Sequence, residues 1–304
     1  MQYKNIRGDF GKEIICESGD SMSDLVPEDL IDMFKTSGVL LFRNFKPDLE
    51  QFNSFAARFG ADFMSYKGGG YIRRKVNEGV DETLLSVNYD HGREQDTFGL
   101  PLHGEMYYVD HRPVSLWFYC KTPAASEGET TICDGSELYN ELSDEHKQLL
   151  NEKRLKYVRS YADGEWQKIY ETEDRDEAVR FAEYNGLSVV VDNENNALNT
   201  EYIQPGVITS RWGGHKVYIN NILTVQWQED MGRKTSIVRF EDGEPIPRSL
   251  IDEVVAIQQR IIVPIAWKAG DFTYIDNTRT LHGRRAFSDK NRDVYLRMVQ
   301  SVEY

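Results

Sequence analysis

Short runs of β-branched and aromatic residues dominate the second half of the chain, and they restrict the possible folds more than any other feature. Each run is bounded by turn-forming residues, and the runs occupy residues 115–120, 130–133, 217–220, 272–275 and 294–302. Val, Ile, Thr, Tyr and Phe fit the pleated surface of a sheet, and short runs of this kind between turns are typical of strands. The sequence therefore predicts a core that is mainly β.

Helical patterns are confined to fewer segments. Apolar residues recur at near-helical spacing over residues 23–36, where Ser23 is the expected N-cap and Gly38 ends the helix. Other expected elements are a buried strand at 39–42 and helices at 49–59, 138–150 and 249–260. Helices placed before and between strands would cover a β core. The predicted fold class is mainly β with helical cover, and a double-stranded β-helix, or jelly roll, is the natural candidate.

The chain has 304 residues, a length at which large β sandwiches and barrels commonly form one unit. A polar stretch at about residues 159–210 contains apolar residues at intervals, among them Trp166, Ile169 and Phe181. A flexible linker would lack such residues, so we interpret this stretch as an ordered insertion. The sequence predicts a single domain over residues 1–304 that carries this inserted segment.

Charge and cysteine content restrict the partners and the compartment. The net charge is -14 and the pI is about 5.0, which disfavours binding to nucleic acid or to anionic membranes. Three cysteines are an odd and sparse set that does not form a disulfide framework. The charged N-terminus has no signal-peptide pattern, and the sequence shows no long apolar stretch. We therefore expect a cytoplasmic protein with no nucleic-acid or membrane partner.

His103-Gly104-Glu105 is a candidate metal-binding motif. In an extended segment, residues i and i+2 project to one face, so the imidazole and the carboxylate would converge without obstruction from Gly104. His282 offers a second imidazole. Two histidines and one carboxylate form the facial triad of non-haem Fe(II) oxygenases, which leaves positions open for a chelating co-substrate and O2. A zinc hydrolase can use the same three ligands, and an isolated H-x-E motif also occurs by chance.

Four blocks of sequence extend this motif into a recognisable order. They are SGVLLFRNFKPDLEQFNSFAARFG, HGEMYYVDHRPVSLWFYCKTPAASEGETTICDGSELYNEL, WQKIYETEDRDEAVRFAEYNGL and GDFTYIDNTRTLHGRRAF. Together they resemble the TauD/TfdA family of Fe(II)- and 2-oxoglutarate-dependent dioxygenases over nearly the whole chain. The third block resembles the SyrP-like branch, and the glutamate of the motif resembles the clavaminate-synthase-like amino-acid oxygenases. Both branches are linked to the oxidation of amino acids.

The resemblance implies the cofactors and the residues that hold them. His103, Glu105 and His282 match the family's Fe(II) ligands, and 2-oxoglutarate and O2 are the implied co-substrates. Thr130 matches a hydroxyl that binds the 2-oxoglutarate carboxylate. Where the family has two glycines before this threonine, the chain has Glu127-Gly128.

An arginine is expected to hold the distal carboxylate of 2-oxoglutarate, because a planar guanidinium binds a carboxylate through two parallel hydrogen bonds. The family pattern favours Arg292, and Arg297 is the alternative. Regular strand alternation would point these two side chains to opposite faces, so only one should enter the site. For Arg284, Arg285 and the arginine that is not used, surface ion pairs are the ordinary expectation.

Substrate contacts are predicted at fewer positions. Asn220 matches an asparagine that the branch places on a central strand, and its alternative role is a buried amide bonded to the backbone. Arg297 is a second candidate for substrate binding. The glycine-rich segment at 65–74 resembles a loop that folds over a site. Glu105 argues against halogenation, because halogenating relatives lack this carboxylate.

The sequence thus predicts an oxygenase that hydroxylates an unactivated C–H bond in a biosynthetic pathway. The expected substrate is an amino acid or a compound derived from one, either free or attached to a carrier protein. Desaturation or ring closure at the same centre is an alternative outcome. Two alternatives fall outside this class: a zinc hydrolase, and a non-catalytic jelly-roll module that binds metal or ligand.

Overall fold

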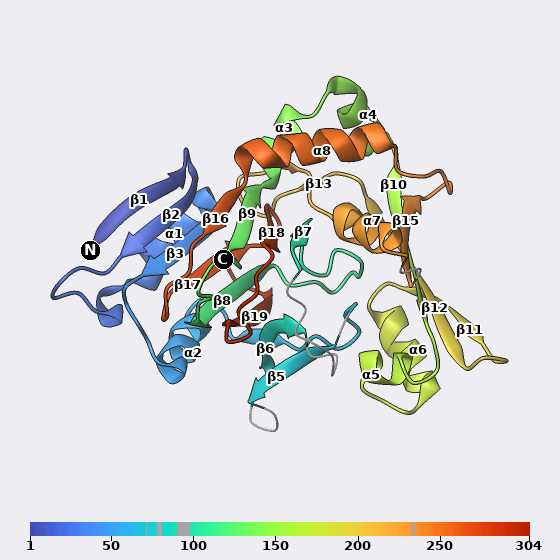
Figure 1. The fold of residues 1–304 in the computed structure, drawn as a ribbon, viewed down its shortest axis with the longest axis horizontal. Coiled ribbons are helices and arrows are strands. Elements are labelled where there is room, and N and C mark those ends of the chain that lie inside the picture. The colour runs from blue at the N-terminus through green and yellow to red at the C-terminus, as the bar shows by residue number, and fades with distance from the viewer. Residues whose placement is uncertain (71, 78–80, 90–97, 233–234) are drawn as a thin grey trace.

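The computed structural model describes residues 1–70, 72–77, 81–89, 98–232 and 235–304 (Figure 1). The largest sheet in this part of the chain has nine strands in the order β1-β2-β3-β17-β8-β19-β6-β5, with β4 paired to β19. Its strands are β1 (Gln2–Arg7), β2 (Phe10–Ile15), β3 (Val39–Arg43), β4 (Asp62–Met64), β5 (Arg73–Asn77), β6 (Asp81–Tyr89), β8 (Ser115–Thr122), β17 (Phe272–Asp276) and β19 (Asp293–Ser301).

A second sheet of four strands packs against the first. Its order is β16-β9-β18-β7, with the bounds β16 (Val263–Ile265), β9 (Thr130–Asp134), β18 (Thr280–Arg284) and β7 (Leu100–His103). One hydrophobic cluster contains Leu85 and Phe118 of the large sheet together with Ile132 and Leu281 of the small one. Two sheets that share one core form a sandwich. The prediction of a mainly β jelly roll is confirmed.

The other face of the large sheet is covered by α1 (Pro27–Ser37) and α2 (Leu49–Ala57). An aromatic cluster fills this layer, and the rings of Trp117 and Tyr274 stack with centroids 4.2 Å apart. Strand β8 serves both layers, because Leu116 and Phe118 face the inner core while Trp117 faces the helices. Its six consecutive buried residues therefore follow from its position between two cores rather than from a one-sided pattern.

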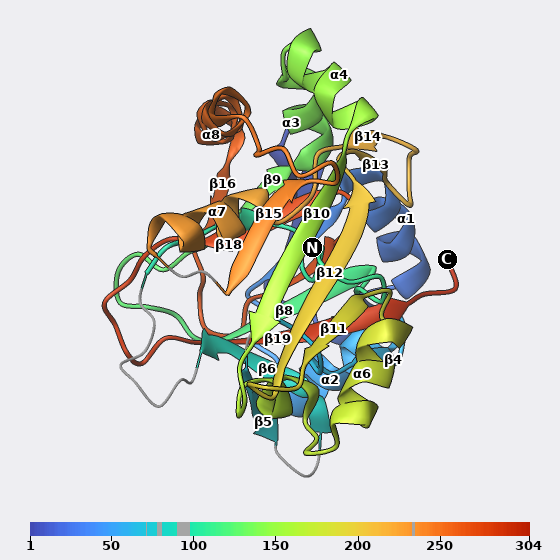
Figure 2. The same cartoon turned by 90° about the vertical axis from the view of Figure 1, so that its right-hand side faces the viewer.

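The expected insertion at about residues 159–210 is ordered and contributes to a third sheet (Figure 2). This sheet has the order β11-β12-β10-β15. The elements between residues 154 and 240 are β10 (Arg154–Tyr161), α5 (Trp166–Tyr170), α6 (Arg175–Tyr184), β11 (Ser188–Asp192), β12 (Ala197–Pro205), β13 (Ile208–Thr209), β14 (Lys216–Val217), α7 (Ile222–Asp230) and β15 (Ser236–Phe240). The organisation of the chain as a single domain remains a prediction.

Three further helices lie at one end of the molecule in Figure 1: α3 (Gly135–Glu141), α4 (Asp144–Glu152) and α8 (Arg248–Ile261). The helix expected at 249–260 is therefore confirmed. The single helix expected at 138–150 is wrong, because the chain is extended at Leu142 and Ser143. The Ser143 hydroxyl accepts a hydrogen bond from the backbone N–H of His146 at 3.4 Å and so begins a new helix.

Two other sequence expectations need correction. The helix expected from Ser23 begins at Pro27, and a short 3-10 turn, η1 (Met22–Asp24), precedes it. Proline is favoured at the first helical position because its missing N–H would have no partner there. The strand expected at 217–220 pairs only over Lys216–Val217, since the chain then turns into α7. No helix in the described residues is long and apolar enough to cross a membrane.

Candidate metal centre

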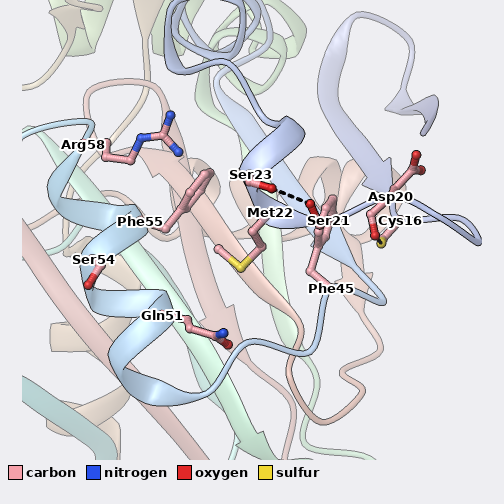
Figure 3. A pocket seen from close by; sticks show the side chains of 10 residues that line it. All are labelled: Cys16, Asp20, Ser21, Met22, Ser23, Phe45, Gln51, Ser54, Phe55 and Arg58. Atoms are coloured by element: carbon pink, nitrogen blue, oxygen red, sulfur yellow. Dashed lines mark hydrogen bonds between the residues drawn. The ribbon is translucent and has the colours of Figure 1, made fainter.

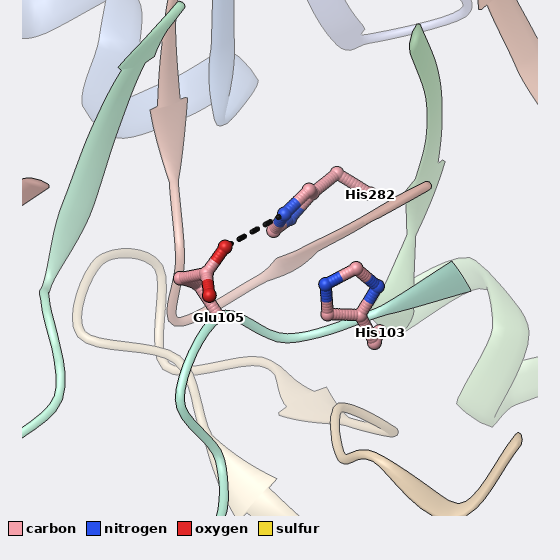
Figure 4. A group of neighbouring side chains, drawn as sticks. All are labelled: His103, Glu105 and His282. Atoms are coloured by element: carbon pink, nitrogen blue, oxygen red, sulfur yellow. Dashed lines mark ion pairs between the residues drawn. The ribbon is translucent and has the colours of Figure 1, made fainter. Parts of the chain in front are cut away.

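Three side chains with metal-binding atoms meet in the interior of the protein (Figure 4). One such atom from each of His103, Glu105 and His282 lies within 4.8 Å of the other two. The three residues are only 5%, 2% and 5% exposed. Nitrogen and oxygen donors without a thiolate suit a divalent ion such as Fe(II), so the donor chemistry of this cluster fits the predicted metal.

The small sheet sets the two histidines opposite each other. His103 is the last residue of β7, and its partner across the antiparallel ladder is His282 on β18. Their ring centroids are 4.5 Å apart. Glu105 lies beyond the strand in a turn where Met106 has a φ of 59°. The expectation of one extended segment is therefore wrong, because this turn carries the carboxylate to the histidines.

Gly104 is required by packing around this turn. A Cβ atom at this position would lie 2.3 Å from the ring of Tyr107 and 2.7 Å from the side chain of Ile219. The backbone N–H of Gly104 also donates to the carbonyl of Asn220 at 3.1 Å. The glycine between His103 and Glu105 thus lets the chain pass through a closely packed core.

Asn277 fixes the backbone of Glu105, and the sequence analysis did not identify this role. Its Oδ1 accepts from the Glu105 N–H at 2.9 Å, and its Nδ2 donates to the Glu105 carbonyl at 3.1 Å. The same Nδ2 donates to the carbonyl of Pro113 at 2.7 Å. The residue is completely buried. The sequence did contain a signal for this residue, because Asn277 belongs to the D-N pair that matches the family motif before His282. No function was predicted for that pair.

Hydrogen bonding selects the form of His103 that can bind a metal. Its Nδ1 lies 2.9 Å from the carbonyl oxygen of Pro101, which can only accept, so Nδ1 carries the proton. The lone pair of Nε2 is then available to a metal. Burial, reinforced by the nearby His282, lowers the pKa of His103 to about 3, so the ring is neutral at physiological pH.

Glu105 is held as a carboxylate by two neighbouring side chains. Burial alone would raise its pKa, but the guanidinium of Arg73 and the ring of His282 outweigh this effect and lower it. Arg73 Nη2 lies 3.3 Å from both carboxylate oxygens, and His282 Nε2 lies 3.3 Å from Oε2. A neutral histidine and an ionised carboxylate are the forms that metal binding requires.

A hollow lies against the three side chains, and its lining includes two residues predicted to bind 2-oxoglutarate. Thr130 lines it from the first position of β9, and its hydroxyl accepts from Trp267 Nε1 at 2.9 Å. Arg292 also lines it and is 1% exposed. Arg292 Nε donates to the Gly128 carbonyl at 2.9 Å, while its buried Nη2 has no hydrogen-bond partner among the described residues.

These features fit a carboxylate ligand. A buried guanidinium without a full set of acceptors is costly, and a bidentate carboxylate would satisfy it. Burial lowers the pKa of Arg292 to about 10, which still leaves it charged at neutral pH. Glutamate replaces the family's first glycine in the turn before Thr130. The turn still forms, and both Glu127 and Gly128 have positive φ values, 59° and 68°.

The other candidate arginines have different surroundings. Arg297 forms an ion pair with Asp81 and lies 4.2 Å from the ring of Phe63, and it is not among the described residues that line the hollow. Arg285 is exposed beside Glu129, as expected, with the two charged groups 3.5 Å apart. For Arg284 the expectation of a surface position is wrong.

Arg284 is 6% exposed and lines the same hollow. Its Nη2 donates to the carbonyl of Phe98 at 3.1 Å, and its guanidinium lies 4.8 Å from the ring of Phe287. The lining of the hollow therefore includes three arginines, Arg73, Arg284 and Arg292, where one was predicted. The signal that could have found Arg284 was its position two residues after His282 on a strand, which places both side chains on one face.

Asn220, the predicted substrate contact, is 2% exposed and bonded to the backbone. Its Oδ1 accepts from the N–H of Ile222 at 3.0 Å at the start of α7. The neighbouring Asn221 instead lines a second hollow. A role of Asn220 in substrate binding remains a prediction.

The second hollow adjoins the first, because both are lined by Arg73, Leu100, His103 and Glu105. Tyr66 of the segment at 65–74 also lines it, together with residues of β10 and α7. Part of the predicted loop therefore forms a wall of the site, although Tyr71 lies outside the described residues. The two hollows therefore lie next to each other along the metal-binding cluster.

A third hollow lies between the segment after β2 and α2 (Figure 3). Its lining includes Cys16, Asp20, Phe45 and Arg58, and it shares no residue with the other two. The Cys16 thiol lies 3.5 Å from the carbonyl oxygen of Asp20. This hollow contains no cluster of metal-binding side chains among the described residues.

The chain matches known proteins over most of its length. A family model described as "Taurine catabolism dioxygenase TauD, TfdA family" matches residues 2–299. A clavaminate synthase-like protein of Arabidopsis thaliana is 27% identical over 278 residues, which cover 86% of this chain and 82% of that protein. The dapdiamide synthesis protein DdaC of Enterobacter agglomerans is 22% identical over 290 residues, which cover 89% and 84%.

Solved structures show the same fold. AAD-2, solved in complex with Mn(II) and N-oxalylglycine, superimposes with a TM-score of 0.67 at 16% identity and covers 98% of this chain and 96% of its own. PvcB of Pseudomonas aeruginosa gives a TM-score of 0.59 at 16% identity, with coverages of 96% and 86%. The family resemblance of the four sequence blocks is thus confirmed. Because the family model spans nearly the whole sequence, the chain belongs to the TauD/TfdA family and is a 2-oxoglutarate-dependent, non-haem iron dioxygenase.

Proposed function

We propose that the enzyme hydroxylates an unactivated C–H bond of an amino acid or an amino-acid-derived compound, with His103, Glu105 and His282 as its Fe(II) ligands. The observation that carries the proposal is the meeting of these three side chains beside a hollow that contains Arg292. The cluster supplies the side chains that would bind a metal ion. The Nη2 of Arg292, which is buried and has no hydrogen-bond partner among the described residues, is suited to bind the carboxylate of a co-substrate.

The bound Fe(II), with 2-oxoglutarate and O2, supplies an oxidant strong enough to attack such a bond. The side chains of this protein hold the 2-oxoglutarate in position. Arg292 holds the distal carboxylate of 2-oxoglutarate, and the Thr130 hydroxyl holds a carboxylate oxygen while Trp267 orients that hydroxyl. Burial of the cluster keeps water away from the reacting carbon, which limits side reactions.

The relatives favour a biosynthetic role. The name of DdaC places that protein in dapdiamide synthesis, and PvcB is described as an Fe, alpha-ketoglutarate dependent oxygenase from an isonitrile synthetic pathway. The Arabidopsis relative is described as clavaminate synthase-like. We therefore propose a small amino-acid-like substrate, free or carrier-bound, in a biosynthetic pathway.

Other outcomes at the same centre are desaturation and ring closure, which differ only in the fate of the substrate radical. A zinc hydrolase with the same ligands is a rival from another class, but it would give Thr130 and Arg292 no role.

Cys16, Cys120 and Cys133 are free thiols, which supports the proposed reducing, cytoplasmic location.

The test measures succinate release with each metal and with variants. The Fe(II)-loaded protein should convert 2-oxoglutarate to succinate when it is offered amino acids or carrier-bound aminoacyl groups, and the Zn(II)-loaded protein should not. His103→Ala should abolish both Fe(II) binding and succinate release. His215→Ala is the matched control, since His215 is exposed and should leave both unchanged. Succinate release by the His103 variant at the wild-type rate would overturn the proposal.

A further inference from the structure

The second hollow, which we call the Arg159 hollow, is built from segments far apart in sequence. Besides the four residues that it shares with the first hollow, its lining includes Tyr66, Tyr108, Arg159, Asn221 and three residues of α7. Arg159 comes from β10 at the start of the inserted segment, and Asn221 immediately precedes α7. The residues that are specific to this hollow therefore come from the segment before β5, the turn after β7, β10 and the start of α7.

The guanidinium of Arg159 is buried and held in a narrow slot. The residue is 7% exposed, and its guanidinium carbon lies 3.4 Å from the centroid of the Tyr108 ring. Its Nη1 lies 3.5 Å from the hydroxyl of Tyr161. On the other side, a Cβ atom at Gly70 would lie 2.6 Å from Nη1 and 2.9 Å from Nη2. The ring and the glycine backbone together fix the plane of the guanidinium.

The glycine run at 68–70 is explained by the same packing. A Cβ atom at Gly69 would lie 2.2 Å from the ring of Tyr66, so no larger residue fits there. The N–H of Gly70 donates to the Tyr108 hydroxyl at 2.9 Å, and that hydroxyl lies 2.8 Å from the hydroxyl of Tyr66. The segment at 65–74 was predicted to be a loop that folds over the site. Its glycines let the backbone lie directly against Arg159. A guanidinium fixed in this way loses little freedom when it binds a ligand.

The charges in this hollow favour an anion. Arg73 is a second guanidinium in the lining, and Glu105 is the one carboxylate among the described residues that line the hollow. That carboxylate already contacts Arg73 and His282 and belongs to the metal cluster. The planar fork of Arg159 matches the two oxygens of a carboxylate.

Asn221 offers the complementary acceptor. Its Oδ1 is buried and has no hydrogen-bond partner among the described residues. The backbone around it is fixed, because its N–H donates to the Tyr157 hydroxyl at 3.0 Å and its carbonyl accepts from the Thr224 hydroxyl at 2.9 Å. Since buried polar atoms in folded proteins normally have partners, this oxygen is suited to accept an N–H from a ligand.

We propose that the Arg159 hollow binds the substrate as a free amino acid, with its carboxylate on Arg159 and an N–H on Oδ1 of Asn221. This inference rests on the proposed function and narrows its substrate class. A carrier-bound aminoacyl thioester has no free carboxylate at that carbon and would leave the Arg159 guanidinium without its ligand. Arg159 is then the residue that separates free amino acids from carrier-bound ones.

The experiment measures binding rather than turnover. Protein loaded with Mn(II) and 2-oxoglutarate is titrated calorimetrically with the common L-amino acids, their primary amides, their N-acetylcysteamine thioesters and their deamino acids. At least one amino acid should bind roughly 10-fold or more tightly than its amide, thioester and deamino acid, since a charged hydrogen bond contributes about 1.5–3 kcal/mol. Arg159→Gln should lose roughly 10- to 100-fold in that affinity and should no longer prefer the acid over the amide.

Two further variants separate recognition from folding. Arg154→Gln changes another arginine of β10 whose side chain is 53% exposed, and it should bind like the wild type. Arg159→Lys keeps the charge and should retain part of the preference for the acid. A panel in which no acid is preferred over its amide or thioester overturns the inference, as does an Arg159→Gln variant that is folded by circular dichroism and keeps the preference.

The failure of this inference is distinguishable from the failure of the proposed function. The visible absorption of the anaerobic Fe(II)–2-oxoglutarate complex reports on the first hollow alone and should be the same in Arg159→Gln and the wild type. An absent absorption band in the wild type would contradict the proposed function. A normal band together with equal binding of acids and thioesters would contradict only the inference about Arg159.

Discussion

At the scale of single residues, Arg292 is the group on which 2-oxoglutarate binding should depend. Its guanidinium is buried in the hollow beside the metal cluster, and one nitrogen lacks a partner among the described residues. Arg292→Gln removes a charged, bidentate contact, so we expect the KM for 2-oxoglutarate to rise roughly 10- to 100-fold. Steady-state succinate assays at varied 2-oxoglutarate measure this change.

Arg297→Gln is the matched control for that prediction. Arg297 is paired with Asp81 away from the hollow, so its loss should lower the stability and leave the KM for 2-oxoglutarate near the wild-type value. The opposite pattern, with a raised KM in the Arg297 variant alone, would assign the co-substrate to the other arginine.

Asn277 should act on the metal through Glu105. Asn277→Ala removes three buried hydrogen bonds, two of them to the backbone of Glu105. We expect the affinity for Fe(II) to fall about 10- to 100-fold, as is usual when a partner of a metal ligand is lost. Competition with a fluorescent chelator measures that affinity. A variant that loses stability but binds metal like the wild type would show that Asn277 serves only the fold.

The residues of the site differ in how far sequence could reveal them. His103, Glu105 and His282 were found because they belong to compact motifs that match a family. Asn277 lies in one of these motifs, but its role depends on contacts with Glu105 and Pro113 that the sequence does not show. Arg159 had no such signal, because a buried arginine acquires its role only from neighbours distant in sequence. Arg284 was assigned to the surface, since a strand arginine is usually exposed when nothing shows which face is buried.

At the scale of elements, the turn after β7 should tolerate little change. A Cβ atom at Gly104 would lie 2.3 Å from the Tyr107 ring, so Gly104→Ala should destabilise the protein by about 1–3 kcal/mol through overpacking and should weaken metal binding. Chemical denaturation measures the stability. Gly99→Ala is the control, because its Cβ would meet no atom closer than 3.5 Å. Equal stability of the two variants would contradict the packing argument.

The connection from β17 to β18 contains a carboxyl group that should make stability depend on pH. Burial raises the pKa of Asp276 to about 6, although hydrogen bonds from Thr278 oppose the shift. The folded state then holds the proton more tightly than the unfolded state does. This contribution is fully present below about pH 4 and is lost as the pH rises through about 6.

Asp276→Asn should remove that dependence. Relative to the wild type, the variant should gain about 2–3 kcal/mol in free energy of unfolding between pH 4 and pH 7. Urea denaturation of both proteins at a series of pH values measures the difference, which cancels the contributions of the other carboxyl groups. A constant difference across this range would show that Asp276 titrates normally in the folded protein.

Most elements were predictable because their residue patterns are local. Strands such as β8, β9 and β17 combine β-branched and aromatic residues between turns, and they formed within two residues of the expected bounds. The errors occurred where polar contacts override the pattern. Ser143 begins a new helix inside an apolar periodicity, and the chain leaves its expected strand after Val217 because Asn220 bonds to the first turn of α7.

At the scale of the whole molecule, the site is assembled by the tertiary fold. β7 and β18 of the small sheet bring the two histidines together, β5 of the large sheet adds Arg73, and β10 of the third sheet adds Arg159. The jelly roll therefore brings together the metal-binding cluster and the first hollow, while β10 and α7 add residues to the neighbouring hollow. Family motifs could predict the first part, and the second part depends on packing that no local pattern shows.

Metal binding should stabilise this whole assembly. The three ligands come from segments that only the folded chain brings together, so the ion binds the native state and not the unfolded one. At 100 times its dissociation constant, a metal adds about 2.7 kcal/mol to the free energy of unfolding. For a chain of this size that corresponds to a rise of roughly 3–6 °C in Tm. Anaerobic calorimetry with Fe(II) and with EDTA measures the shift, and His282→Ala should show none. A shift of equal size in that variant would place the stabilising ion somewhere other than this cluster.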